Sequence, residues 1–376
     1  MVEPRTAKDK DCVTLQVQIH NSRTASKPPG LTIGEKIVSI DNMLDAWHLI
    51  KARHEHDCAT IRFDCALMQN IARIRSQLLH RIWKPDRYHS FLVYEPKERL
   101  INAPGIENRL VQQMWALVCE PVFERIFVDE SYACRKGKGQ TDAVRSLQRA
   151  LRSMRYADSR YIVKLDFRHY FKSIPHETAR RCIRERIDDD LALWIADTII
   201  DSYNPGFPIG SLLSQLVGNI VLDKVDHYMK DELGAFAQGR YMDDIWFEAE
   251  TLERAEDMMD AVARKAWSDL GLEVNGNKCK VLHVKRPYQF SDGIDFCGCR
   301  VHPYSLYVRD ATISRACRRI DKLTNDVIAG RRNPEILTTQ LESFHGLAAH
   351  KDSSARVRMA DKSTIARTCR IISRFS

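Results

Sequence analysis

The sequence predicts an α+β fold in which an antiparallel sheet carries helices on one face. Residues 161–167 are rich in β-branched and aromatic side chains, which is typical of a strand. Residues 241–247 hold two apolar pieces around a pair of acids, which predicts a hairpin with the acids at its turn. Apolar residues recur at helical spacing over 212–221 and 252–270. The resulting order of strand, helix, hairpin and helix is that of an α+β sheet.

The N-terminal third predicts helices around one basic hairpin. Residues 1–35 are polar and contain one short alternating stretch, so we interpret them as a flexible extension. Helical spacing begins at Ser39 and returns over 71–82, and residues 94–101 read as two short strands around a basic turn. Gly271 is expected to end the amphipathic helix over 252–270.

Composition narrows the class of protein. The chain has 376 residues and a formal net charge of +8. No apolar run approaches the roughly 18 residues of a membrane-spanning helix, and residues 1–10 are too charged for a signal peptide, so we expect a cytoplasmic protein without a membrane partner. The 11 scattered cysteines are then expected to be reduced.

The charge distribution points to a polyanionic partner. Residues 280–376 contain 18 basic and 9 acidic side chains, so the C-terminal quarter holds the whole positive excess. Lys and Arg side chains that neutralise phosphates release condensed counterions, which favours binding to nucleic acid. A solvated basic surface explains the same charge balance about equally well.

Three acids are the strongest candidates for chemistry. Asp166 ends the predicted strand, and Asp243 and Asp244 occupy the predicted hairpin turn, so the three can converge at one edge of the sheet. Mg²⁺ prefers oxygen ligands and retains waters and substrate phosphates, so two or three carboxylates suffice to bind it beside a nucleotide. Two such ions can stabilise both oxygens of an in-line phosphoryl displacement. An isolated Asp-Asp pair would more often simply form a turn.

Four ordered motifs resemble those of reverse transcriptases, over roughly residues 91–301. Tyr241-Met242-Asp243-Asp244 resembles the YxDD box, and the stretch 165–174 resembles the motif that supplies the first metal-binding Asp. Residues 270–278 are similar to the next family motif, and 296–299 resemble the primer-grip turn, with Cys in place of Leu. Residues 208–215 read PIGSLLSQ, which resembles a variant of the family's QGxxxSP motif in which Ile replaces Gln and Gln replaces Pro. This variant points to diversity-generating retroelement enzymes, which are similar to group II intron reverse transcriptases.

The resemblance implies roles for individual residues. Asp166, Asp243 and Asp244 would be catalytic and, with the backbone carbonyl of Phe167, would hold two Mg²⁺ ions, which Mn²⁺ could replace. The deoxynucleoside triphosphate (dNTP) would be bound by Lys97, Arg99, Phe171, Ile209, Gly210, Gln215 and Lys278. The primer grip would consist of Phe296, Cys297 and Gly298. Phe171 would exclude a 2′-hydroxyl, although it could instead be an aromatic residue of the core. The basic residues could instead be ordinary exposed surface charges.

The implied architecture is a right-hand polymerase. Fingers would span 36–154, a palm 155–302 with the fingers–palm motif at 205–220, and a basic helical thumb 303–376. The expected function is RNA-directed DNA synthesis of low fidelity in a diversity-generating retroelement. Expected partners are an RNA template, a DNA or RNA primer, dNTPs and a structured noncoding or template RNA, with a small basic accessory protein or a homo-oligomer as further partners. An antiviral reverse transcriptase with a noncoding RNA, and a non-catalytic nucleic-acid-binding module, remain alternatives.

Overall fold

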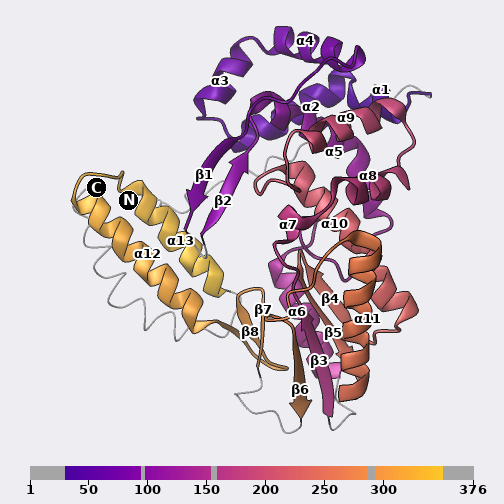
Figure 1. Cartoon of the computed structure of the whole chain (residues 1–376). Helices are drawn as coiled ribbons and strands as arrows, with labels where there is room; N and C mark the ends of the chain where they lie inside the picture. Colours follow the sequence, from indigo (N-terminus) through magenta and orange to yellow (C-terminus); the bar gives the residue numbers. More distant parts are fainter. Residues whose placement is uncertain (1–29, 95–97, 154–158, 286–292, 350–376) are drawn as a thin grey trace, which may run out of the picture.

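A computed structural model describes residues 30–94, 98–153, 159–285 and 293–349. The predicted extension over 1–35 therefore lies outside the described residues, apart from 30–35. Figure 1 shows an N-terminal helical region above a central sheet and a pair of C-terminal helices to one side. Within the described residues no helix is both long and apolar enough to cross a membrane.

The N-terminal region is helical and carries one two-stranded ribbon. Its elements are α1 (Ile33–Ile37), α2 (Ile40–Arg53), α3 (Cys58–Cys65), α4 (Leu67–Leu79), β1 (His89–Val93), β2 (Arg99–Ala103), α5 (Ile106–Glu124) and α6 (Gln140–Ser153). Ser39 begins α2, because its side chain accepts a hydrogen bond from the Asn42 N–H. The helical spacing predicted from Ser39 is therefore confirmed.

The central sheet has four antiparallel strands in the order β4-β5-β3-β6. The strands are β3 (Ser159–Leu165), β4 (Gln238–Tyr241), β5 (Asp244–Ala249) and β6 (Lys280–Lys285). The helices between them are α7 (Tyr170–Ser173), α8 (His176–Arg184), α9 (Asp190–Asp201), α10 (Leu212–His227), the π-helical turn η2 (Tyr228–Glu232) and α11 (Leu252–Leu270). Gly271 ends α11 with φ +68°, as the sequence predicts.

The two faces of the sheet pack against different elements. Val163, Leu165 and Phe247 point into the main core, which contains the apolar sides of α10 and α11. Ile162 and Trp246 alternate to the opposite face and pack with residues of α6 and of a small three-stranded sheet. That small sheet consists of β7 (Ile294–Phe296), β8 (Cys299–Val301) and β9 (Leu306–Val308). The α+β class is therefore confirmed, and α6 adds a helix on the second face.

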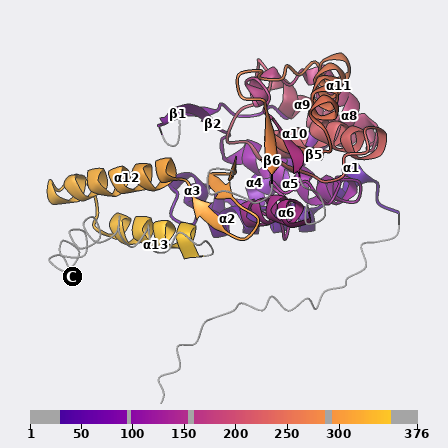
Figure 2. The same ribbon diagram turned by 90° about the horizontal axis from the view of Figure 1, so that it is seen from below.

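The C-terminal helices form a hairpin that leaves the rest of the molecule. They are α12 (Asp310–Ile328) and α13 (Glu335–Ala349), and Figure 2 shows them extending away from the central sheet. Ile313, Ile320 and Phe344 are buried between them. Arg318, Arg319 and Lys322 of α12 are exposed, so this helix carries a basic outer face.

Three consecutive acids, residues 188–190, lead into α9. The Asp189 side chain accepts a hydrogen bond from Ala192 N–H at 2.9 Å, and Asp190 is the first residue of the helix. An Asp at this position satisfies an N–H group that the helix cannot pair internally.

Candidate active site

The sheet brings the three predicted acids to one edge. Leu165 of β3 lies opposite Ile245 of β5, so the next residue, Asp166, follows the strand toward Asp244. Tyr241 pairs with Asp244, which leaves Met242 and Asp243 as the turn. Met242 has φ +54°, the left-handed conformation that tight hairpin turns require. The predicted hairpin is thus present, with Asp243 in its turn and Asp244 as the first residue of β5.

A buried ion pair supports this turn from below. Arg240 and Asp226 are each about 1% exposed and lie 2.7 Å apart. Arg240 also donates to the Met242 carbonyl at 3.3 Å, the Asn219 side chain at 3.0 Å and the Ser131 hydroxyl at 2.9 Å. Because these bonds use the donors of one guanidinium, the Met242–Asp243 turn is fixed relative to α10.

The segment after α11 docks onto Asp166. Asn275 N–H donates to the Asp166 carbonyl at 2.8 Å, and Phe167 forms an isolated bridge with Val274. The bonds of this bridge are made by flanking residues, so it does not use the Phe167 carbonyl that was expected to face a metal. Lys278 Nζ lies 2.5 Å from Asp166 Oδ1. Lys278 therefore reaches the carboxylate directly.

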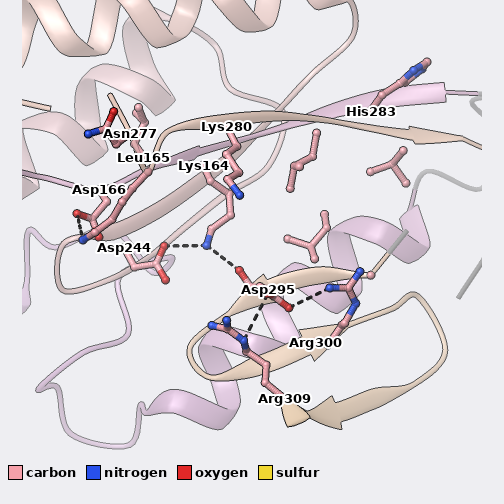
Figure 3. A pocket seen from close by; sticks show the side chains of 15 residues that line it. Lys164, Leu165, Asp166, Asp244, Asn277, Lys280, His283, Asp295, Arg300 and Arg309 are labelled. Carbon is pink, nitrogen blue, oxygen red and sulfur yellow. Dashed lines mark hydrogen bonds and ion pairs between the residues drawn. The ribbon is translucent and has the colours of Figure 1, made fainter. Parts of the chain in front are cut away.

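A second lysine holds the other accessible acid. Lys164 Nζ lies 3.2 Å from Asp244 Oδ1 and donates to the Asp295 carbonyl at 2.6 Å. Both acids line one cavity of about 560 Å³ between β6 and the β7–β8 hairpin (Figure 3). The rim of this cavity also carries Arg300 and Arg309, which are ion-paired with Asp295 (Figure 3).

The electrostatics of the edge favour a divalent cation. Burial, followed by the charges of Asp166 and Asp244, raises the pKa of Asp243. Burial also raises the pKa of Asp244, while Lys164 opposes that rise. Carboxylates crowded in this way are stabilised when a cation enters between them.

A metal site made by protein side chains alone is not found. Across residues 30–94, 98–153, 159–285 and 293–349, no group of three or more His, Cys, Asp or Glu side chains could hold an ion. Asp166 and Asp244 are instead ion-paired with Lys278 and Lys164. Mg²⁺ usually relies on one or two carboxylates plus substrate phosphates, so Asp166 and Asp243 still fit that ion.

The predicted primer-grip residues form a tight turn beside Asp244. Phe296 and Cys299 pair across the β7–β8 hairpin, with Cys297 at φ +46° and Gly298 at φ +74° between them. The Cys297 N–H donates to the Asp244 carboxylate. The Cys297 carbonyl accepts from Gln140, and the Gly298 carbonyl accepts from Arg309 N–H at 3.3 Å. The structure thus places this turn next to the acids.

Phe171 lies beside α10. It belongs to α7, is half-buried, and its ring centroid lies 5.3 Å from that of Tyr170. A Cβ added at Gly218 of α10 would come within 3.2 Å of the Phe171 ring, so this glycine permits the close approach. Tyr170 is buried and donates to the Gly218 carbonyl at 2.6 Å.

Two other predicted dNTP-binding residues line a second cavity. Gly210 and Gln215 line a separate cavity of about 360 Å³, together with Arg53, His54 and Arg109. The Ile209 carbonyl accepts from Asn102 N–H at 2.8 Å, which ties this loop to β2.

The structure describes one of the two basic residues predicted to lie on the β1–β2 ribbon. Arg99 is the first residue of β2 and is exposed. Lys97 lies outside the described residues.

Sequence reasoning missed three supporting residues. Lys164 is a polar residue in an apolar strand, which is a usable signal for a functional side chain. Arg240 directly precedes the YxDD stretch, and burial of a charge there required a distant partner that the sequence does not identify. Gln112 is fully buried and accepts from Ser211 Oγ at 2.8 Å and Leu213 N–H at 3.1 Å, so it caps α10 in place of the Ser211 side chain.

Comparison with known proteins identifies the family. Residues 82–301 match the family model described as reverse transcriptase (RNA-dependent DNA polymerase). Protein YkfC of Escherichia coli K12 is 24% identical over 238 residues, covering 56% of this chain and 60% of YkfC. The group II intron-encoded protein LtrA of Lactococcus lactis is 23% identical over 143 residues, covering 35% of this chain and 23% of LtrA.

The chain is also similar to solved structures. A telomerase structure from Candida albicans has a TM-score of 0.46 and 11% identity, covering 64% of this chain and 51% of that one. The chain spans 60% of the length of YkfC and about a quarter of the length of LtrA. The family match over 82–301 confirms the resemblance on which the right-hand polymerase fold was predicted.

Proposed function

We propose that this chain, which belongs to the reverse transcriptase family, is an RNA-directed DNA polymerase that extends a primer 3′-hydroxyl with dNTPs. The observation that carries the proposal is the meeting of Asp166 with the Asp243–Asp244 turn at one edge of the sheet. The adjoining cavity is lined by Asp166 and Asp244 together with residues of β6 and β7, so open space lies beside two of the three carboxylates.

Each side chain has a distinct task in this reaction. Asp166 and Asp243 would hold two Mg²⁺ ions, which stabilise the attacking and leaving oxygens when bound. Lys278 would leave Asp166 for the pyrophosphate group, whose charge its ammonium neutralises. Phe171 would pack under the sugar of the dNTP. Arg99 and Lys97 would hold the triphosphate as charge-assisted donors.

Primer extension on a defined RNA template tests the proposal. The wild-type protein should add dNTPs to a DNA or RNA primer, and Asp243→Ala should reduce the rate by about a thousandfold or more, since a metal ligand is lost. Asp257→Ala is the matched control, because this α11 acid is exposed. Equal product from wild type and Asp243→Ala, with retained RNA binding, would favour a non-catalytic binding module instead.

We further propose that synthesis has low fidelity, as in diversity-generating retroelements. Ile209 offers only packing where a Gln side chain could hydrogen-bond, so selection of the incoming base relies on shape alone. Ile209→Gln should therefore lower misincorporation opposite template adenine several-fold, about the effect of one added hydrogen bond. Sequencing of the products measures this, with Ile209→Leu as the control that keeps an apolar side chain. Identical error spectra for all three proteins would refute the proposal.

The biological setting proposed is template-directed diversification, for which the motif at 208–215 is the support. RNA copurified with the protein should then contain a template repeat, and its complementary DNA should carry mutations at adenines. Copurification of an unrelated structured RNA, copied without such mutations, would favour the antiviral alternative.

A further inference from the structure

We infer that Lys164 is a positioning residue that ties the carboxylate edge to the primer-grip turn, and thereby aligns the primer 3′ end with the reaction centre. This inference rests on the proposed polymerase function. It concerns a residue to which neither the sequence motifs nor the family match gives a role. Lys164 would act through the elements it joins, without touching the substrate.

The contacts of Lys164 come from two separate sheets. Its backbone belongs to β3 of the four-stranded sheet, where it pairs with Trp246. Its ammonium reaches Asp244 Oδ1 at 3.2 Å and the Asp295 carbonyl at 2.6 Å, and Asp295 belongs to β7 of the three-stranded sheet. Figure 3 shows the side chain extending between these two acceptors.

A third contact fixes the same ammonium from the side. Lys164 Nζ lies 5.7 Å from the centroid of the Phe296 ring, in a cation–π arrangement. The Lys164 side chain is 18% exposed, so its interactions are less screened by water than those of a fully exposed lysine. A flexible, fully solvated side chain would not make three such contacts at once.

Asp244 completes the connection. Its carboxylate accepts from Lys164 on one side and from the Cys297 N–H of the turn on the other. Asp244 thus contacts both Lys164 and the primer-grip turn. Asp244 would therefore set the position of the turn, while Asp166 and Asp243 would remain as the acids that hold the ions.

The neighbouring strand provides a matched control. Lys280 of β6 lies directly opposite Lys164 in the β3–β6 ladder and lines the same cavity. It is exposed, and within the described residues no ion pair of its side chain is recorded. Removal of either lysine takes the same charge from the same cavity, but only Lys164→Met removes the polar contacts that join Asp244 to the Asp295 carbonyl.

Steady-state primer extension is the first measurement. Lys164→Met should lower kcat about tenfold or more and leave the KM for dNTP nearly unchanged, because a misaligned primer slows the chemical step without weakening dNTP binding. Lys164→Arg, which keeps the charge and donors, should recover most of this loss. Lys280→Met should stay within about twofold of wild type. An equal loss in Lys280→Met and Lys164→Met, or no loss in either, would overturn the inference.

Hydrogen–deuterium exchange of peptides covering residues 294–299 is the second measurement, and it needs neither substrate nor metal. Lys164→Met should exchange these amides at least several-fold faster than wild type, and Lys280→Met should not. Unchanged exchange in Lys164→Met would overturn the inference even if primer extension works. Faster exchange in a protein that extends no primer would support the connection and refute the polymerase proposal instead.

Discussion

The two hairpins that carry the predicted reaction residues are built in opposite ways. The β4–β5 hairpin lies inside a four-stranded sheet, and Arg240 beneath its turn is 1% exposed. The β1–β2 ribbon is a sheet of only two strands, and Phe91 and Leu92 on it are 50% and 45% exposed. The first therefore holds its acids in one position, whereas the second presents its side chains to whatever binds there.

This difference follows from what each hairpin has to do. Carboxylates that hold ions beside a reacting phosphate must stay within a fraction of an ångström, which requires support from buried groups. A ribbon that meets an incoming substrate gains from low local stability, since few buried contacts resist its movement. The contrast makes predictions for mutations under each hairpin.

Loss of the buried ion pair should have the largest effect on stability. Arg240→Met leaves Asp226 buried without its partner, which should lower the free energy of unfolding by about 3–5 kcal/mol. Chemical denaturation measures this. Arg254→Met of α11, at an exposed hydrogen bond, is the control and should cost about 0.5 kcal/mol or less. A loss below 1 kcal/mol in Arg240→Met would show that the turn does not depend on this support.

A second acid under the same hairpin should make stability depend on pH. Burial, and then the charge of Asp226, raises the pKa of Asp223 to about 6. The folded state then binds more protons than the unfolded state between about pH 4 and pH 6, so stability falls as pH rises through that window. Asp223→Asn should therefore stabilise the protein by about 1–3 kcal/mol at pH 8 and have little effect near pH 4.

Denaturation of wild type and Asp223→Asn at both pH values checks this result. Asp231→Asn is a useful comparison, because this acid is exposed and bonds His227 at 2.8 Å. Equal stability of wild type and Asp223→Asn at pH 8 would contradict the account.

Substitution in the exposed ribbon should have the smallest effect on stability. Arg99→Gln should change the free energy of unfolding by about 0.5 kcal/mol or less, since the side chain is exposed. It should nevertheless raise the KM for dNTP about tenfold, because one charge-assisted bond to the triphosphate is lost. An unchanged KM would mean that this ribbon does not contact the triphosphate.

Local patterns predicted much of the fold and the main acids. The span of α11 and its end at Gly271, the strand before Asp166 and the hairpin around Asp243 all follow from apolar spacing and turn chemistry over short stretches. The convergence of Asp166 with Asp243 was predictable because both lie at strand ends next to apolar runs.

Long-range partners could not be predicted in the same way. The pairing of Arg240 with Asp226 depends on how α10 crosses the sheet, and that of Lys164 with Asp244 and Asp295 on how two sheets meet. The capping of α10 by Gln112 joins residues about a hundred positions apart. In each case the physical requirement, a partner for a buried polar group, is visible in the sequence, but the identity of the partner is not.

Counting bound ions tests the central claim most directly. Mn²⁺ paramagnetic resonance, with a primer–template ending in a dideoxynucleotide and the matching dNTP, should find two ions bound per wild-type protein. Asp243→Asn should lose at least one of them, whereas Asp257→Asn should keep both. Equal numbers of bound ions in wild type and Asp243→Asn would contradict the assignment of this edge of the sheet as the reaction centre.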